Sequence, residues 1–137
     1  MSYLVDTNVF GEQAKPRPDA KVIEWLRAHE SELYVSTITI GEIRRGIERL
    51  PHGSRRAQLH LWLQALCDCM QGRILNFNVS TAHVWGQLKA SWEKSRIAVS
   101  SLDSQIAATA SRHSLTVVTR NTADFERTGI RTLNPFL

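Results

Sequence analysis

The sequence has few of the residues that small proteins use for covalent or metal-based stabilisation. Its 137 residues include two cysteines, Cys67 and Cys69, which would point in different directions on a helix. They are poorly placed to form a disulfide or to share a zinc ion, so we expect reduced thiols. The five histidines are scattered, without the spacing of a structural zinc site. The composition therefore does not favour a fold that depends on disulfides or zinc.

Long apolar runs are also absent. No stretch approaches the ~20 apolar residues of a membrane-spanning helix. The N-terminus lacks the pattern of a signal peptide, because strand-like residues begin at Tyr3 and an acid follows at Asp6. We therefore expect a soluble, cytoplasmic protein without membrane contacts. The length is typical of one domain, and no linker, repeat or low-complexity segment interrupts the chain, so we expect a single domain over residues 1–137.

The charge balance is moderately basic. Seventeen basic and 13 acidic side chains give a net charge of +4, which is a modest indication of a polyanionic partner. Five arginines fall close together in the sequence, at Arg44, Arg45, Arg49, Arg55 and Arg56. They are candidates for nucleic-acid binding, although a solvated helix face and loop would have the same composition.

Short apolar runs alternate with helical patterns along the chain. Apolar runs predict strands over residues 3–5, 33–35, 73–77 and 115–119, with a further short strand over 129–133. Apolar residues at helical spacing predict helices over residues 21–30, 39–50, 55–72, 80–94 and 101–113. Strands separated by helices favour right-handed βαβ units. We therefore expect an α/β fold with a mostly parallel sheet covered by helices on both faces.

Four acids fall where a parallel sheet would bring them to one edge. Asp6 follows the first strand, Glu42 lies one turn into the helix after the second, and Asp103 lies in the first turn of the alanine-rich helix. Asp124 follows the 115–119 strand by a few residues. Ligands of open α/β sheets bind beyond the carboxyl ends of the strands. Each acid also has a purely structural interpretation: Asp6 as a helix cap, Glu42 in a Thr39-x-x-Glu42 capping box, Asp103 at a helix dipole and Asp124 in a turn.

Four neighbouring carboxylates need a counter-charge. Two carboxylates about 5 Å apart repel by roughly 3 kcal/mol at an effective dielectric near 20. No lysine or arginine adjoins Asp6, Glu42 or Asp103 in the sequence. A divalent cation would supply the missing charge, and all-oxygen ligation suits Mg²⁺ or Mn²⁺. A metal held in this way can activate water and neutralise a phosphodiester in its transition state.

Several segments resemble PIN-domain ribonucleases, above all the VapC and FitB toxins of bacterial toxin–antitoxin pairs. These segments are "YLVDTNVF", "LYVSTITIGEIRRGIERL", "GRILNFN", "SLDSQIAATASRHSLTVVTRNTADFERTGI" and "LNPFL". The resemblance implies a PIN-like three-layer α/β/α fold and Mg²⁺- or Mn²⁺-dependent cleavage of cellular RNA, such as tRNA or rRNA. It also implies inhibition by a cognate VapB- or FitA-type antitoxin.

The same resemblance implies roles for individual residues. Asp6, Glu42 and Asp103 match the catalytic acids, and Asp124 matches a fourth, more variable one. Asp6 and Asp103 would bind the metal directly. The supporting polar residues of the pocket would be Thr7, Asn8, Thr119 and Asn121. Three positions depart from the family pattern, namely Gly11, Asn78 and Ser114, and the first of these suggests weak local stability over residues 9–14.

Two further expectations concern partners. The resemblance favours a homodimer, and the large Trp85 and Trp92 indoles on one helix are hard to bury in so small a domain. The antitoxin is expected to place a basic residue near Asp6 and Asp103 and an apolar stretch beside helices 18–30 and 39–50. The alternative function is a non-catalytic nucleic-acid-binding module that uses the Arg44–Arg56 cluster and needs no metal.

Overall fold

The computed structural model describes all residues from Met1 to Leu137 and is built around a five-stranded sheet. The strand order is β3-β2-β1-β4-β5, and every neighbouring pair is parallel. Leu4 in the central strand lies opposite Tyr34 on one side and Val117 on the other. The strands are β1 (Tyr3–Val5), β2 (Leu33–Ser36), β3 (Ile74–Leu75), β4 (Thr116–Val118) and β5 (Thr132–Leu133).

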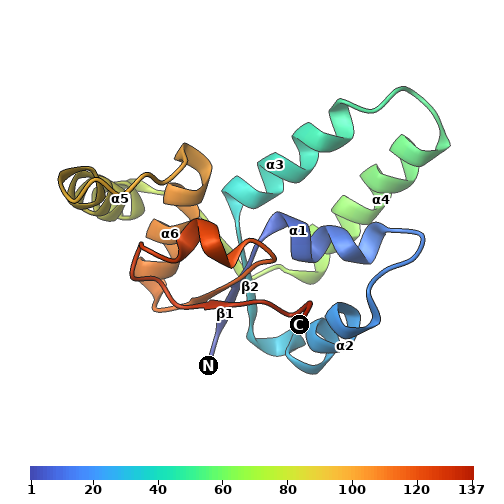
Figure 1. Ribbon diagram of the computed structural model, residues 1–137. Helices are drawn as coiled ribbons and strands as arrows, with labels where there is room; N and C mark the ends of the chain where they lie inside the picture. The colour runs from blue at the N-terminus through green and yellow to red at the C-terminus, as the bar shows by residue number, and fades with distance from the viewer.

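Helices cover both faces of this sheet (Figure 1). They are α1 (Thr7–Phe10), α2 (Ala20–Ala28), α3 (Thr37–Glu48), α4 (Ser54–Cys69), α5 (Val79–Lys94) and α6 (Ser101–His113). Short 3₁₀ turns cover Gly11–Ala14, Glu30–Glu32 and Thr122–Phe125. The predicted α/β class with a parallel sheet is confirmed. No helix is long and apolar enough to cross a membrane.

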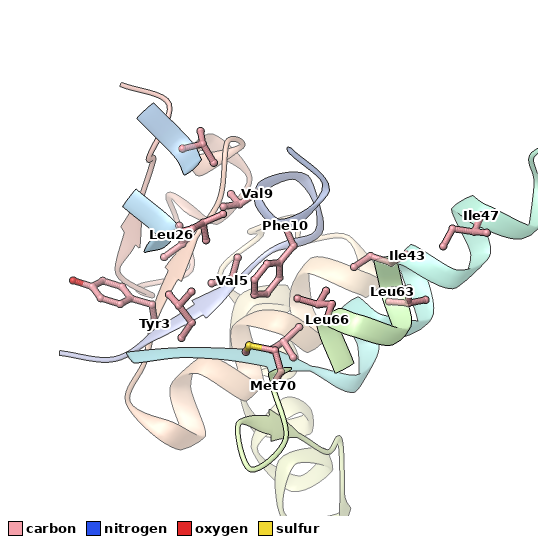
Figure 2. Close-up of a cluster of buried hydrophobic side chains, with 14 residues drawn as sticks. Tyr3, Val5, Val9, Phe10, Leu26, Ile43, Ile47, Leu63, Leu66 and Met70 are labelled. Carbon is pink, nitrogen blue, oxygen red and sulfur yellow. The ribbon is translucent and has the colours of Figure 1, made fainter. Parts of the chain in front are cut away.

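Two apolar clusters hold the layers together, one on each face of the sheet. The larger one joins β1 and β2 to α1, α2, α3 and α4, and Figure 2 shows Phe10 and Leu66 between the strands and the α3–α4 pair. The smaller one joins Leu4 and Val117 to α6, whose alanines Ala107 and Ala110 are fully buried. These small residues let α6 pack closely on the sheet. The first turn of α6 lies at the carboxyl edge of the strands.

Both tryptophans of α5 have hydrogen-bond acceptors within the chain. The Trp92 side chain is 4% exposed, and its indole N–H donates to the Thr128 carbonyl at 3.3 Å. Trp85 is half-buried and donates to the Ser104 hydroxyl at 2.8 Å. The chain itself therefore supplies hydrogen-bond acceptors for both indoles, from α6 and from the turn after Phe125, and the indoles give no support for a second subunit. A homodimer remains an expectation from the resemblance alone.

At the three positions that depart from the family pattern, the local structure accommodates the residue that is present. Gly11 keeps helical angles and caps α1, and its N–H donates to the Thr7 carbonyl. The Asn78 side chain caps α5 by accepting from the Thr81 N–H at 3.1 Å. Ser114 ends α6 in the left-handed region at φ 56°, where a glycine would be less strained.

Candidate functional site

The carboxyl edge of the sheet is organised around Asp6. This residue directly follows β1 and caps α1, since its Oδ1 accepts from the Thr7 N–H at 2.8 Å. Its Oδ2 accepts from the Thr119 hydroxyl at 2.9 Å. The helix-capping interpretation of Asp6 is therefore correct, but it uses only one of the two carboxylate oxygens. The second oxygen ties the end of β1 to the end of β4.

Glu42 is drawn towards this centre by Thr7. The Thr7 hydroxyl donates to Oε2 of Glu42 at 3.3 Å, while the Thr7 N–H binds Asp6. One threonine therefore bridges the two acids. The alternative interpretation of Glu42 as part of a Thr39-x-x-Glu42 capping box is wrong, because Ser36, three residues before Thr39, caps α3 by accepting from the Ile38 N–H. Glu42 is thus free of a capping role.

Asp103 is positioned by the start of α6. The Ser100 hydroxyl caps this helix and accepts from the Asp103 N–H at 3.2 Å. The adjacent Ser104 is fully buried, and it accepts from the Trp85 indole and donates to the Ser101 carbonyl at 2.6 Å. Sequence reasoning missed Ser100, Ser104 and Trp85 as supports of this turn. The serine before an acid in the first turn was the available signal for the cap.

The polar residues after β1 and β4 form one network. The Thr119 oxygen accepts from the Asn8 amide at 3.4 Å and from the Asn121 N–H at 3.1 Å. The side-chain oxygen Oδ1 of Asn8 accepts from the Arg120 N–H at 3.0 Å. Asp124 lies exposed in the 3₁₀ turn that follows. The structure therefore joins all four expected supporting residues to Asp6, and Thr7 and Thr119 are the two that touch it directly.

The four acids influence one another without a basic partner. Burial raises the pKa of Asp6 above its ordinary value; hydrogen bonds from Thr7 and Thr119 lower it, and the charges of Glu42 and Asp124 raise it. Burial also raises the pKa of Asp103; the Ser100 bond lowers it, and the charges of Asp124 and Asp6 raise it. None of the ion pairs in the structure includes any of the four acids. The edge therefore carries uncompensated negative charge.

The oxygen atoms at this edge are of the kind that binds a hard cation, but they do not surround a single metal position. No three histidine, cysteine, aspartate or glutamate side chains are grouped closely enough to hold a metal ion. The available donors are carboxylate and hydroxyl oxygens, which suit Mg²⁺ or Mn²⁺ rather than zinc. Carboxylates without a counter-charge repel one another, and this repulsion is a physical reason for the separation of the acids.

The five candidate arginines fall into two groups. Arg44 and Arg56 both form ion pairs with Glu48, the former at 2.8 Å, and Arg55 donates to the Ala14 carbonyl at 2.8 Å. Arg45 and Arg49 are exposed and appear in no ion pair. The sequence cluster is therefore not one uniform basic surface.

An apolar groove lies on the larger-cluster side of the molecule. It has a volume of about 340 Å³ and is lined by apolar side chains of α1, α2 and α4, including Phe10, Leu26, Trp62 and Leu66, and by Met70 just after α4. The sequence-based expectation placed such a groove beside helices 18–30 and 39–50. This groove has the first of these helices as one wall, and α4 rather than α3 forms the other.

The chain belongs to the PIN domain family, which matches residues 3–130. It is similar to Toxin FitB of Neisseria gonorrhoeae, with 36% identity over 97% of both chains. It is equally similar to VapC ribonuclease Y4jK of Sinorhizobium fredii, at 36% identity over 97% of this chain and 96% of that protein. Plasmid stability protein StbB of Pseudomonas syringae pv. tomato is 37% identical over 97% of both chains.

Solved structures agree with this assignment. The fold is similar to that in the crystal structure of FitAcB from Neisseria gonorrhoeae, with a TM-score of 0.90, 35% identity and 98% of both chains covered. A structure of FitAB bound to the IR36 DNA fragment gives a TM-score of 0.91 at 34% identity, covering 98% of this chain and 96% of that one. The resemblance to PIN-domain toxins of the VapC and FitB type is thereby confirmed over nearly the whole chain.

Proposed function

We propose that the protein is the toxin of a type II toxin–antitoxin pair and a Mg²⁺- or Mn²⁺-dependent endoribonuclease that acts on cytoplasmic RNA. The observation that carries the proposal is the uncompensated acidic edge formed around Asp6 in a chain of the PIN family. The names of its relatives, Toxin FitB and VapC ribonuclease, support the same activity. The substrate is proposed to be tRNA or rRNA, and tRNA is favoured because one relative at 26% identity is named a tRNA(fMet)-specific endonuclease.

The metal would be held by Asp6 and Asp103. Bound there, Mg²⁺ or Mn²⁺ would lower the pKa of a water and neutralise charge on the scissile phosphate. Binding should also bring the two carboxylates together, because their repulsion disappears once a cation lies between them. Thr7 and Thr119 occupy fixed lone pairs of Asp6, so that its remaining lone pairs keep a defined direction.

The other acids would act on water. Glu42, oriented by the Thr7 hydroxyl, and Asp124, on the exposed turn, are suited to accept hydrogen bonds from water beside the phosphate. Asn8 and Asn121 would keep Thr119 in place rather than touch the substrate. Catalysis then depends on a small polar network whose charged members come from four different elements.

An antitoxin of the VapB or FitA type is the proposed partner. The titles of similar structures name FitAB and FitAcB complexes. The apolar groove between α2 and α4 would receive an apolar segment of the antitoxin, and a basic antitoxin residue would neutralise Asp6 and Asp103 in place of metal. A homodimer is proposed from the family resemblance.

The test is cleavage of a mixed RNA pool by the purified chain. Cleavage is expected with Mg²⁺ or Mn²⁺, and none is expected in EDTA. Co-expression with the product of a neighbouring small gene should restore growth to cells that the chain arrests. RNA binding without cleavage in any divalent metal would instead support the non-catalytic binding module.

A further inference from the structure

The exposed face of α3 continues directly from Glu42. In a helix, residues three, four and seven positions apart share a face, so Glu42, Arg45, Gly46 and Arg49 lie in one row. Arg45 lies about 4.5 Å and Arg49 about 10.5 Å further along the helix axis than Glu42. Side chains of a helix lean towards its N-terminus, so both arginines lean back towards Glu42. In Figure 1, α3 leaves the edge of the sheet and projects away from it.

Among the five clustered arginines, the two of this row are the ones whose side chains make no ion pair or hydrogen bond within the molecule. Arg44 lies on the other side of α3 and pairs with Glu48, which also binds Arg56. Arg45 and Arg49 are exposed and make no ion pair or side-chain hydrogen bond. The row begins with the proposed catalytic acid Glu42 and continues with two arginine side chains that have no partner in the molecule. This arrangement suits the binding of a polyanion that passes through the site.

Gly46 lies between these arginines, and the protein itself does not require it to be a glycine. It is exposed in the interior of α3, its φ is not positive, and an added Cβ would meet nothing within 4 Å. Glycine is a poor helix former, so folding alone would favour another residue at this position. A glycine at this position also lets a ligand approach the helix backbone closely.

We propose that Arg45, Gly46 and Arg49 form a phosphate track on α3 that binds the RNA strand next to the scissile bond. The proposal rests on the ribonuclease function proposed above. Each arginine contacts one phosphate, and Gly46 lets the sugar–phosphate backbone lie against the helix. The track leads the strand to Glu42 and from there to Asp6.

RNA binding is measured in the Asp103→Asn background, in which the strand should stay intact, by fluorescence anisotropy over a salt series. Arg45→Gln with Arg49→Gln should weaken binding about tenfold and flatten the log–log salt dependence by about 1.4 for two single-strand phosphate contacts. The matched control is Arg112→Gln with Arg131→Gln. It removes the same charge from exposed side chains at the opposite edge of the sheet and should leave the salt slope within 0.3 of the parent, a threshold of about half of one contact.

Equal effects of the two double variants would overturn the proposal, since net charge alone would then explain them. An unchanged slope in the Arg45 and Arg49 variant would also overturn it. So would lost affinity for the co-expressed antitoxin with unchanged RNA affinity, which would assign the row to a protein partner.

Gly46 gives an independent test, because a substitution there should raise stability but weaken RNA binding. Gly46→Gln should raise the melting temperature, because glutamine is the better helix former. The same change should raise KM for RNA severalfold, because its side chain covers the track. A higher melting temperature with unchanged KM would contradict the track.

If wild-type protein cleaves no RNA in Mg²⁺ or Mn²⁺, the proposed function and the track fail together. If it cleaves and the α3 variants match it in KM and salt slope, only the track fails.

Discussion

The Thr119 hydroxyl donates to Oδ2 of Asp6 at 2.9 Å and so joins the ends of two neighbouring strands, although the two residues are far apart in the sequence. Thr119 is fully buried, and its oxygen also accepts from Asn8 and Asn121. The hydroxyl proton is therefore directed at Asp6, because two donors occupy the other side of the oxygen. This contact fixes one carboxylate oxygen of the central acid.

Thr119→Val should impair the site while keeping its shape. Valine has nearly the same size, but it removes the donor that lowers the pKa of Asp6. The acidic limb of the pH–activity profile should therefore move to higher pH. Unpaired Asn8 and Asn121 donors should lower the free energy of unfolding by about 1–3 kcal/mol. Thr119→Ser restores the hydroxyl and should restore the wild-type profile; an unshifted profile in the valine variant would show that the bond does not tune Asp6.

Asp103→Asn should raise stability without metal, whereas Asp6→Asn also loses one of the two hydrogen bonds that the Asp6 carboxylate accepts from Thr7 and Thr119. Both acids have raised pKa values in the folded state. Above pH 3.8 the unfolded state loses these protons first, so the folded state holds more protons and stability falls as pH rises through the folded pKa. In EDTA at pH 7, Asp103→Asn should therefore melt at a higher temperature than wild type. Mn²⁺ should raise the melting temperature of wild type but not of either variant. An Asp103→Asn protein that melts lower than wild type in EDTA would contradict this electrostatic account.

Glu12 should show the opposite pH dependence. It is 4% exposed, accepts from the Asp19 N–H at 2.9 Å and pairs with Lys15 at 2.9 Å. The close contact of its carboxylate with the Lys15 ammonium is the main cause that lowers its pKa. Its contribution is therefore complete above pH 4.5 and is lost as pH falls through the folded pKa. Glu12→Gln should destabilise the protein by about 1–3 kcal/mol at pH 7, and denaturant unfolding should show the difference shrinking in acid. A difference that stays constant with pH would exclude a role for the charge.

Trp85→Phe should reduce activity more than stability. The change removes the indole donor to Ser104, next to Asp103, while keeping an aromatic ring. We expect kcat to fall severalfold with KM little changed, because the first turn of α6 is less well fixed. Trp92→Phe is the matched control: it removes the bond to the Thr128 carbonyl in the core and should lower stability by about 1 kcal/mol with kcat retained. Equal kcat values for the two variants would assign Trp85 to packing alone.

The sequence predicted the elements well, because apolar periodicity reports which face of each element is buried. Asp6, Glu42 and Asp103 were singled out as candidates because they follow predicted strands or open a helix. The structure added contacts between distant residues, such as Thr7 with Glu42 and Trp85 with Ser104, which no local pattern encodes. Ser36 rather than Thr39 caps α3, since several nearby hydroxyls could serve and only tertiary packing selects one. The division of the arginines by Glu48 likewise depends on how α3 meets α4.

The most direct test of the account is RNA cleavage by wild type and by Asp103→Asn, side by side in Mn²⁺ and in EDTA. Both proteins should be shown to be folded by circular dichroism and thermal melting. The account predicts cleavage by wild type in Mn²⁺ alone, and a loss of at least about a hundredfold in the variant. Wild-type cleavage that persists in EDTA, or a folded Asp103→Asn that cleaves at the wild-type rate, would contradict it.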